Sequence, residues 1–203
     1  MSTTNGIRDA EVTDAKTIAE IHVRCWREVY AFMPQAVHKQ RDYRYRFRQW
    51  MTWFDNQQCG EALFVLESNG QIVGFSMAKP NTDNAISVPG EMHACYLLPQ
   101  FRGTDLGPLG LMALAASLKQ RDLWPACLWA FQENPYRRIY PFLGCKPEVF
   151  RHRMIAGIGL PEIGYRVTDY DALMARLDRM RASAAQRRIQ SPRPQLQSSR
   201  LPA

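Results

Sequence analysis

One strand–loop–helix segment constrains the fold of this 203-residue chain more than any other feature. Residues 91–98 are an apolar, strand-like run that ends at Pro99, and residues 109–120 have the apolar periodicity of a helix. Gly103 and Gly107 lie between them. Such glycines let backbone N–H groups face outward beside the positive end of the helix dipole, which favours an anion. The spacing is neither that of a Walker loop nor that of a Rossmann fingerprint. The segment therefore predicts an anion-binding turn in an α/β domain.

A β-hairpin precedes this segment. Ala62–Glu67 and Gln71–Ala78 are apolar, β-rich runs, and the Asn69-Gly70 pair between them favours a tight turn because both residues tolerate positive φ. Further strands are expected at residues 126–131, 148–155 and 161–167, and residues 7–10 show a short apolar-polar alternation. Helices are expected from Thr13 and Asp14 onward past Cys25, at residues 36–54 and at residues 135–143. This order of elements describes a mixed α/β sheet.

The composition excludes several classes of protein. Apolar residues make up 46% and charged residues 22% of the chain, which is typical of a globular domain. No apolar run approaches the roughly 18 residues of a membrane-spanning helix, and the first 25 residues contain four acidic side chains, unlike a secretory signal. Five widely spaced cysteines without a C-x-x-C pair predict reduced thiols in a cytoplasmic protein, with neither a disulfide framework nor a metal site.

The net charge of +7 is concentrated near the C-terminus. Residues 181–203 contain five arginines, no acidic residue and few large apolar side chains. We therefore expect a basic, disordered tail at 181–203 after one domain at 1–180. The rest of the chain carries 21 basic and 19 acidic side chains, which is too balanced for a broad nucleic-acid-binding face. Nucleic-acid binding through the tail or the Arg-rich helix at 41–48 remains a third alternative.

Several short motifs, in their order along the chain, resemble the GNAT superfamily of acyl-CoA-dependent N-acyltransferases, in particular its small-molecule branch. The resemblance covers roughly residues 7–170. The motifs are Trp26-Arg-Glu-Val-Tyr30, Ile-Val-Gly-Phe at 72–75, Gly90-Glu-Met-His-Ala-Cys-Tyr-Leu-Leu-Pro99, Arg102-Gly-Thr-Asp-Leu-Gly107, and Leu128-Trp129 followed by Asn134, Tyr140 and Leu143-Gly144. The resemblance implies an α/β (α+β) fold with a mostly antiparallel, twisted sheet of about seven strands and about four flanking helices. It also implies acetyl-CoA as acyl donor, no metal, and direct attack by a primary amine.

The resemblance also assigns roles to residues of this chain. Backbone groups around Cys95, Tyr96 and Leu97 would hold the pantetheine arm and polarise the thioester carbonyl. Glu91 would take the proton from the attacking amine, directly or through water, and Tyr140 would return a proton to the CoA thiolate. The pyrophosphate would be held by Arg102, Gly103, Thr104, Leu106 and Gly107, with Asn134 as a further cofactor-binding residue.

The acceptor pocket of such a protein comes largely from its first two helices and its closing strands. Here that implies Trp26, Tyr30, His93 and Tyr165. The acceptor would be a small-molecule amine, or the N-terminus or a lysine of a peptide, and the aromatic lining with few acids speaks against a strongly cationic polyamine. No membrane partner is expected, and a homodimer stays open.

Three departures from the family pattern bear on function, and the first two, Asp105 and Pro108, keep another class of function open. Asp105 replaces the central glycine of the loop, which would place a carboxylate near the pyrophosphate, and Pro108 removes an N–H there. The interval from Asn134 to Tyr140 is one residue shorter than usual. The alternative is a catalytically silent module of the same fold, which binds acyl-CoA weakly or acts as an interaction domain.

Single residues also have alternative interpretations. Glu91 could be a solvated residue at the start of its strand, and Tyr140 could be a packing residue. Period-two alternation predicts that His93 shares a strand face with Glu91 and Cys95, where it could act as the base, line the acceptor pocket or simply pack. A thiol nucleophile formed by Cys95 with His93 is a further alternative.

Overall fold

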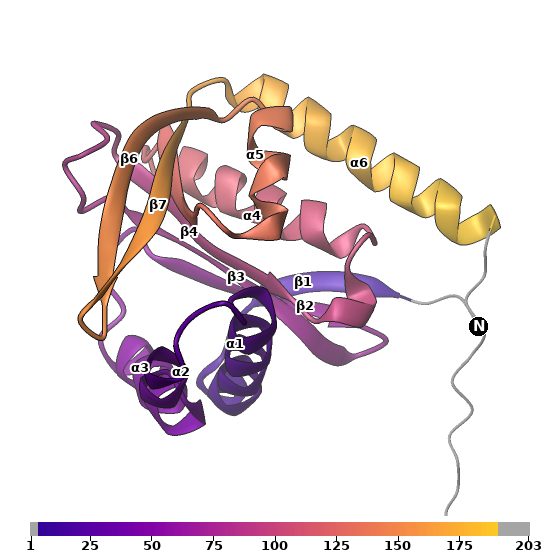
Figure 1. The fold of residues 1–203 in the computed structure, drawn as a ribbon. Helices are drawn as coiled ribbons and strands as arrows, with labels where there is room; N and C mark the ends of the chain where they lie inside the picture. Colours follow the sequence, from indigo (N-terminus) through magenta and orange to yellow (C-terminus); the bar gives the residue numbers. More distant parts are fainter. Residues whose placement is uncertain (1–3, 191–203) are drawn as a thin grey trace, which may run out of the picture.

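Residues 4–190 are described in the computed structural model, and they form a seven-stranded sheet with helices on both faces (Figure 1). The strand order is β1-β2-β3-β4-β5-β7-β6. The strands are β1 (Asn5–Asp9), β2 (Ala62–Ser68), β3 (Gln71–Pro80), β4 (Gly90–Leu97), β5 (Ala126–Phe131), β6 (Lys146–Ile155) and β7 (Ile158–Val167). The α-helices are α1 (Ala15–Val29), α2 (Gln35–Gln40), α3 (Tyr43–Asp55), α4 (Leu106–Gln120), α5 (Ile139–Phe142) and α6 (Tyr170–Gln190). Short 3-10 turns are η1 (Val12–Asp14), η2 (Pro99–Phe101) and η3 (Pro135–Arg138).

The sheet divides at one pair of neighbouring strands. β4 is antiparallel to β3 along its whole length, but it is parallel to β5 over only two residue pairs, Gly90↔Ala126 and Glu91↔Cys127. The other neighbouring strands are antiparallel. A parallel pair requires a crossover connection, which α4 supplies. Beyond Glu91 the two strands diverge, so residues 92–97 of β4 have no partner in β5. The expected mixed, mostly antiparallel sheet is confirmed.

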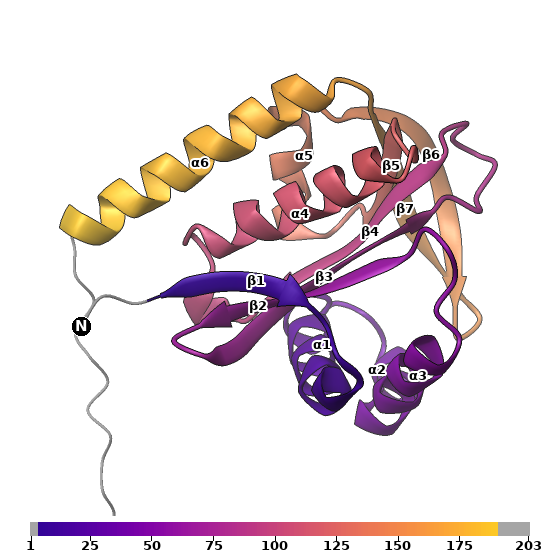
Figure 2. The same ribbon diagram turned by 180° about the vertical axis from the view of Figure 1, so that it is seen from behind.

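Two helical layers cover the sheet. α1, α2 and α3 lie on one face, and α4, α5 and α6 lie on the other (Figures 1 and 2). The apolar residues of α1 recur at helical spacing, so they form one buried stripe against β2 and β3. On the opposite face α4 and α6 share a core with β4, β5 and β7. The buried leucines that α4 and α6 contribute to this core are Leu114, Leu118, Leu173 and Leu177. Each helical layer therefore forms a separate apolar core with one face of the sheet.

Local turn chemistry sets two element boundaries. Asn69 and Gly70 have φ of 52° and 75°, which confirms the predicted hairpin turn between β2 and β3. The single helix predicted over residues 36–54 is wrong, because α2 ends at Gln40 and a new helix starts at Tyr43. Asp42 separates them: its carboxylate accepts a hydrogen bond from the Tyr45 N–H at 2.8 Å and caps α3.

The C-terminal helix α6 was not expected from the sequence pattern. It runs from Tyr170 to Gln190, so the domain boundary predicted at residue 180 falls inside a helix, and residues 181–190 are helical and not disordered. The rest of the predicted tail, residues 191–203, lies outside the described residues. Between residues 4 and 190, none of the helices has the length and apolar character needed to cross a membrane.

Candidate active site

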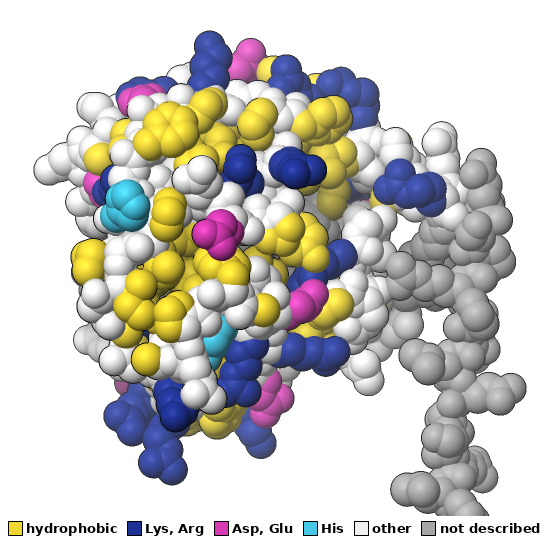
Figure 3. Space-filling view, viewed as in Figure 1, with side chains coloured by type: hydrophobic (Ala, Val, Ile, Leu, Met, Phe, Trp, Pro, Cys, Tyr) yellow, Lys and Arg dark blue, Asp and Glu magenta, His cyan; other side chains and the backbone are white. Residues whose placement is uncertain are grey.

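A cavity of about 680 Å³ opens where β4 and β5 diverge. Its walls come from β4, β5, the loop before α4, the first turns of α4, the η3–α5 segment and α6. Figure 3 shows hydrophobic side chains across this side of the molecule, with Lys and Arg side chains along the upper edge. No Asp or Glu side chain lines the cavity among residues 4–190, whereas Arg102, Arg179 and Arg187 do. The cavity is therefore apolar in its depth and positive at one end.

The loop before α4 brings glycine backbone to the cavity wall. Gly103 and Gly107 both line the cavity, and a Cβ added at either position would meet no atom within 4 Å. Gly103 has a φ of 75°, a conformation that residues with a Cβ rarely adopt. The space beside these glycines lets a ligand approach the backbone at the N-terminus of α4, where the helix dipole favours an anion.

Three other loop residues differ from what the family pattern implied. The Asp105 carboxylate accepts a hydrogen bond from the Asn5 amide of β1 at 2.5 Å and does not line the cavity, so it lies away from the proposed phosphate position. Leu106 is fully buried in the core with Leu66, so only its backbone is near the turn. Pro108 lines the cavity in the first turn of α4, a position that suits proline.

Arg102 bridges three elements at the edge of the cavity. Its guanidinium donates to the Glu28 carboxylate at 2.6 and 3.0 Å and to the Tyr136 hydroxyl at 2.6 Å. Its Nε donates to the Leu97 carbonyl at 3.0 Å. Burial lowers the pKa of Arg102, but the Glu28 carboxylate more than offsets this and raises the pKa overall. In this arrangement the side chain ties α1 and η3 to the end of β4.

Glu91, His93 and Lys79 form a charge network at the start of β4, in which only Glu91 is buried. The register of β3 and β4 shifts between Met77 and Ala78, which leaves His93 as an extra, bulged residue of β4. His93 Nδ1 lies 2.6 Å from a Glu91 carboxylate oxygen, and Lys79 Nζ lies 3.2 Å from the other. His93 lines the cavity and Glu91 does not. Glu91 is buried, so the interpretation of a solvated strand-start residue is wrong.

The charge state of Glu91 follows from these contacts. Burial raises the pKa of the Glu91 carboxyl, but the hydrogen bond from His93, the charge of His93 and then the charge of Lys79 outweigh burial and lower the pKa overall. An ionised carboxylate accepts hydrogen bonds only, so His93 Nδ1 must carry the hydrogen. In the neutral ring, a hydrogen on Nδ1 leaves Nε2 of His93 as a proton acceptor beside the cavity.

Cys95, Tyr96 and Leu97 all line the cavity, but they face different layers. The Cys95 sulfur faces α4, because a Cβ added at Gly110 would lie 3.2 Å from it. The Tyr96 ring instead packs on His22 of α1. The bulge at His93 breaks the simple alternation, so the shared face predicted for His93 and Cys95 is wrong. Burial raises the pKa of the Cys95 thiol to about 12, which opposes the thiol-nucleophile alternative.

Tyr140 lies in α5 across the cavity from β4. Its side chain lines the cavity, and its ring packs on Tyr165 with centroids 5.4 Å apart. Burial, followed by the nearby Cys95 and Tyr96, raises the pKa of the phenol, so it stays protonated at neutral pH. Tyr165, which was expected to line the acceptor pocket, is buried behind Tyr140.

The predicted acceptor residues are only partly at the cavity surface. Tyr30 lines the cavity and its hydroxyl accepts a hydrogen bond from the Asn134 amide at 3.4 Å, while Asn134 caps η3 through the Tyr136 N–H. Trp26 is buried beneath Tyr30, with ring centroids 4.6 Å apart, and is not part of the lining. Trp26 therefore supports Tyr30 from behind.

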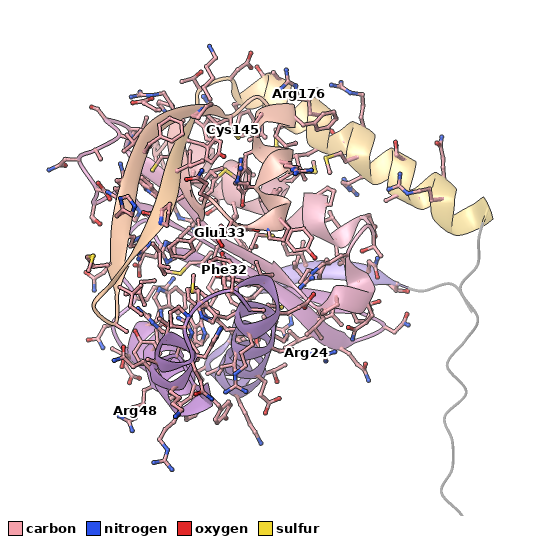
Figure 4. The ribbon with its side chains drawn as sticks, viewed as in Figure 1. Arg24, Phe32, Arg48, Glu133, Cys145 and Arg176 are labelled. Carbon is pink, nitrogen blue, oxygen red and sulfur yellow. The ribbon has the colours of Figure 1, made fainter. Side chains whose placement is uncertain are left out.

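Sequence reasoning missed the contribution of α6. Arg179, Met180, Ser183 and Arg187 line the cavity from this helix. Arg176 holds the helix in place by donating to the Phe142 carbonyl at 2.9 Å; Figure 4 shows it close to Cys145 under α6. The same view shows Arg24 and Arg48 on the other helical layer. An available signal was the spacing of Leu173, Leu177, Met180 and Ala184, which is that of an amphipathic helix.

Metal ligands do not gather in the part of the chain that the structure describes. Between residues 4 and 190, no group of three or more His, Cys, Asp or Glu side chains is arranged to hold a metal ion.

Known proteins are similar to this chain, one in sequence and others in fold. Over 175 residues the chain is 26% identical to "Uncharacterized N-acetyltransferase YuaI" of Bacillus subtilis (strain 168), which covers 85% of this chain and 98% of that protein. The yncA protein of Salmonella typhimurium, solved with its cofactor acetyl-CoA, has a TM-score of 0.62 at 18% identity and covers 81% of this chain and 94% of its own. A ribosomal-protein-alanine N-acetyltransferase of Brucella melitensis has a TM-score of 0.63 at 18% identity. The match covers 81% of this chain and 99% of the Brucella chain. These two structures share the fold.

The strongest assignment comes from a family model. The model of the acetyltransferase (GNAT) family matches residues 16–140, which is more than half of the chain. The matched part runs from α1 through the glycine loop to Tyr140, and so it includes most of the cavity. This chain is therefore an acetyltransferase and belongs to the GNAT family.

Proposed function

We propose that this acetyltransferase moves the acetyl group of acetyl-CoA to a primary amine by direct attack in the cavity between β4 and β5. One observation supports the proposal most. A single cavity has glycine backbone at a helix N-terminus at one end and, on another wall, His93, which is bonded to Glu91 behind it. An anion site and a proton acceptor in one enclosure are what an amine acetylation with a phosphorylated donor requires.

The residues present fit acetyl-CoA at two places. The open space beside Gly103 and Gly107 admits a pyrophosphate against backbone N–H groups of the loop. The edge of β4 from Cys95 to Leu97 has no β5 partner, so the backbone groups on that edge, apart from the Leu97 carbonyl that Arg102 bonds, are available to the pantetheine arm. When bound there, acetyl-CoA supplies an activated thioester carbonyl. A backbone N–H aimed at the carbonyl oxygen lowers the barrier by about 3 kcal/mol.

Arg102 has a different role from the one that the family pattern implied. Its three nitrogen atoms already donate to Glu28, Tyr136 and the Leu97 carbonyl. We therefore assign the pyrophosphate to the backbone of Gly103, Thr104 and Gly107. Arg102 then keeps the loop attached to α1 and η3.

His93 is the residue that takes the proton from the amine in this mechanism. Only a free amine attacks a thioester, so a base must remove a proton before or during attack. His93 lines the cavity, and its Nε2 is free to accept. Glu91 is a positioning residue, because it holds Nδ1 of His93 without reaching the cavity. This replaces direct base catalysis by Glu91, as first expected from the family pattern.

Tyr140 is the residue that returns a proton to the leaving sulfur. The phenol lines the cavity and stays protonated because burial raises its pKa. It can therefore donate as charge builds on the sulfur. The acceptor enters beside Tyr30 and His93. It is a primary amine carried by a small molecule, or by the N-terminus or a lysine of a peptide.

The silent-module alternative loses one of its two supports. The Asp105 carboxylate is bonded to Asn5 and not turned into the cavity, so it does not repel a phosphate there. Pro108 still removes one N–H from the first turn of α4.

Two measurements separate the enzyme from the silent module. In the first, acetyl-CoA is added at a hundredfold excess over its Kd, which should stabilise the folded protein by about 2.7 kcal/mol and raise its melting temperature. In the second, thiol release from acetyl-CoA is followed with a panel of amines. Amine-dependent release supports the proposal. Binding without release for every amine favours the silent module. An absence of binding at millimolar acetyl-CoA overturns the proposed function and leaves only the interaction-domain form of the silent module.

A further inference from the structure

The C-terminal helix α6 forms a wall of the cavity, although it lies outside the residues that the family model matches. Leu173 and Leu177 anchor it in the core against α4. The Arg181 guanidinium forms an ion pair with the Asp178 carboxylate at 3.5 Å and donates a hydrogen bond to the Met112 sulfur of α4 at 4.0 Å. These contacts fix the orientation of the helix, so the residues of one face are held toward the cavity.

The cavity face of α6 carries two unpaired arginines. Arg179, Ser183 and Arg187 are spaced by four residues, so they lie on one side of the helix, and all three line the cavity. Both arginines are exposed, and neither has a hydrogen bond or an ion pair within the described part of the chain. Two guanidinium groups without a carboxylate partner, at the wall of one cavity, are available to an anionic ligand.

The charges around the cavity are otherwise balanced or absent. The charge of Arg102 is paired with Glu28, and no Asp or Glu side chain among residues 4–190 lines the cavity. Arg179 and Arg187 therefore supply the unpaired positive charge of the cavity lining. Eight residues of α-helix separate them by about 12 Å along the axis, a spacing that suits a ligand with phosphates at two positions.

We propose that α6 binds the nucleotide end of CoA, and that Arg179 and Arg187 recognise its 3′-phosphate together with its pyrophosphate. This inference rests on the proposed function, because it takes CoA as the ligand. The glycine loop contacts the pyrophosphate from one side through its backbone, and α6 faces it with guanidinium groups. A 3′-phosphate carries close to two negative charges at neutral pH, and arginine binds such groups with paired hydrogen bonds. The helix thus makes the protein selective for CoA over donors without that phosphate.

Calorimetry with CoA and with 3′-dephospho-CoA tests the proposal without relying on activity. For the unsubstituted protein we expect CoA to bind at least tenfold more tightly than dephospho-CoA. In the double variant Arg179→Gln/Arg187→Gln, CoA binding should weaken tenfold or more, whereas dephospho-CoA binding should weaken distinctly less, so that the two affinities converge. The two single variants show which arginine carries the discrimination.

Arg181→Gln is the matched control, because Arg181 lies on the same helix, has its own partners and does not line the cavity. It should leave the ratio of the two affinities unchanged, and melting curves show whether each variant is folded. The proposal is overturned if the double variant keeps the full preference for CoA, or if the unsubstituted protein binds both ligands equally. If neither ligand binds to the unsubstituted protein, this proposal and the proposed function fail together. Tight, selective CoA binding without any amine acetylation overturns the function alone.

Discussion

The two edges of β4 behave in opposite ways. Toward β3 the strand is paired from Gly90 to Leu97, whereas toward β5 the pairing ends after Glu91. The paired edge continues into the hairpin, whose inward side chains, such as Val65 and Phe75, are fully buried. The unpaired edge borders the cavity. The edge toward β3 therefore contributes to the stability of the fold, whereas the edge toward β5 is available for ligand binding.

One irregularity connects the two edges. The bulge leaves His93 without a partner in β3. The same residue lines the cavity and contacts the Glu91 carboxylate. Bulges commonly turn a side chain toward a functional site. Substitutions on the two edges should therefore differ in whether they lower turnover or stability.

The largest effect is expected at the bulge. His93→Gln keeps a polar side chain but removes proton acceptance, so kcat should fall by about 10²–10⁴, equivalent to about 2.7–5.4 kcal/mol of barrier. Steady-state kinetics with a reactive amine measures it. His152→Gln, at an exposed position of β6 outside the cavity lining, is the matched control and should leave kcat unchanged. Normal turnover of folded His93→Gln would exclude His93 as the base.

On the paired side, the effect should be on stability alone. Leu63 of β2 is buried in the core beneath α1 and does not line the cavity. Leu63→Ala should lower the free energy of unfolding by about 2–5 kcal/mol. Urea denaturation measures this, and turnover per folded molecule should match the parent. A variant that is fully stable but has lost turnover would contradict the division between the two edges.

Tyr140→Phe tests the wall opposite β4. The ring and its packing on Tyr165 are kept while the proton donor is lost, so kcat should fall by about 10²-fold with little change in the affinity for acetyl-CoA. Kinetics and calorimetry together measure the two quantities. A purely structural Tyr140 would instead lower the melting temperature and preserve turnover. Tyr43→Phe, at an exposed position of α3, serves as the control.

The smallest effect is expected for Glu91→Gln, and it depends on pH. The folded state lowers the pKa of Glu91, so the ionised carboxylate stabilises the protein above the unfolded-state pKa of about 4.3. This contribution disappears as the pH falls through the lower pKa of the folded state. The stability difference between parent and variant should thus be largest near neutral pH and shrink in acid, as measured by urea denaturation from pH 7 to pH 3. A difference that grows in acid would reverse the assigned pKa direction.

Features encoded by local residues were predictable from the sequence. The Asn69-Gly70 turn and the strand–loop–helix around Gly103 depend on backbone preferences that a few neighbouring residues express. The cavity residues of β4 and the loop followed from the family resemblance, since motif order constrains which segments meet.

Features created by distant contacts were not predictable in this way. The bulge at His93 arises from the register with β3, and period-two alternation cannot reveal it. Asp105 turns away from the cavity because Asn5, a hundred residues earlier, offers it an amide. The apolar spacing of α6 was visible in the sequence, but its placement at the cavity depends on packing against α4.

The short contact between β4 and β5 also affects how the molecule can move. Because the two halves of the sheet share ladder pairs only at Gly90 and Glu91, they are held together mainly by apolar packing under α4 and α6. Packing is not directional, so the halves can separate slightly without breaking the hydrogen bonds within either half. Amide hydrogen exchange should accordingly be slowest within β2–β3 and β6–β7 and faster at those amides of residues 92–97 that face β5, and a ligand in the cavity should slow exchange at these amides selectively.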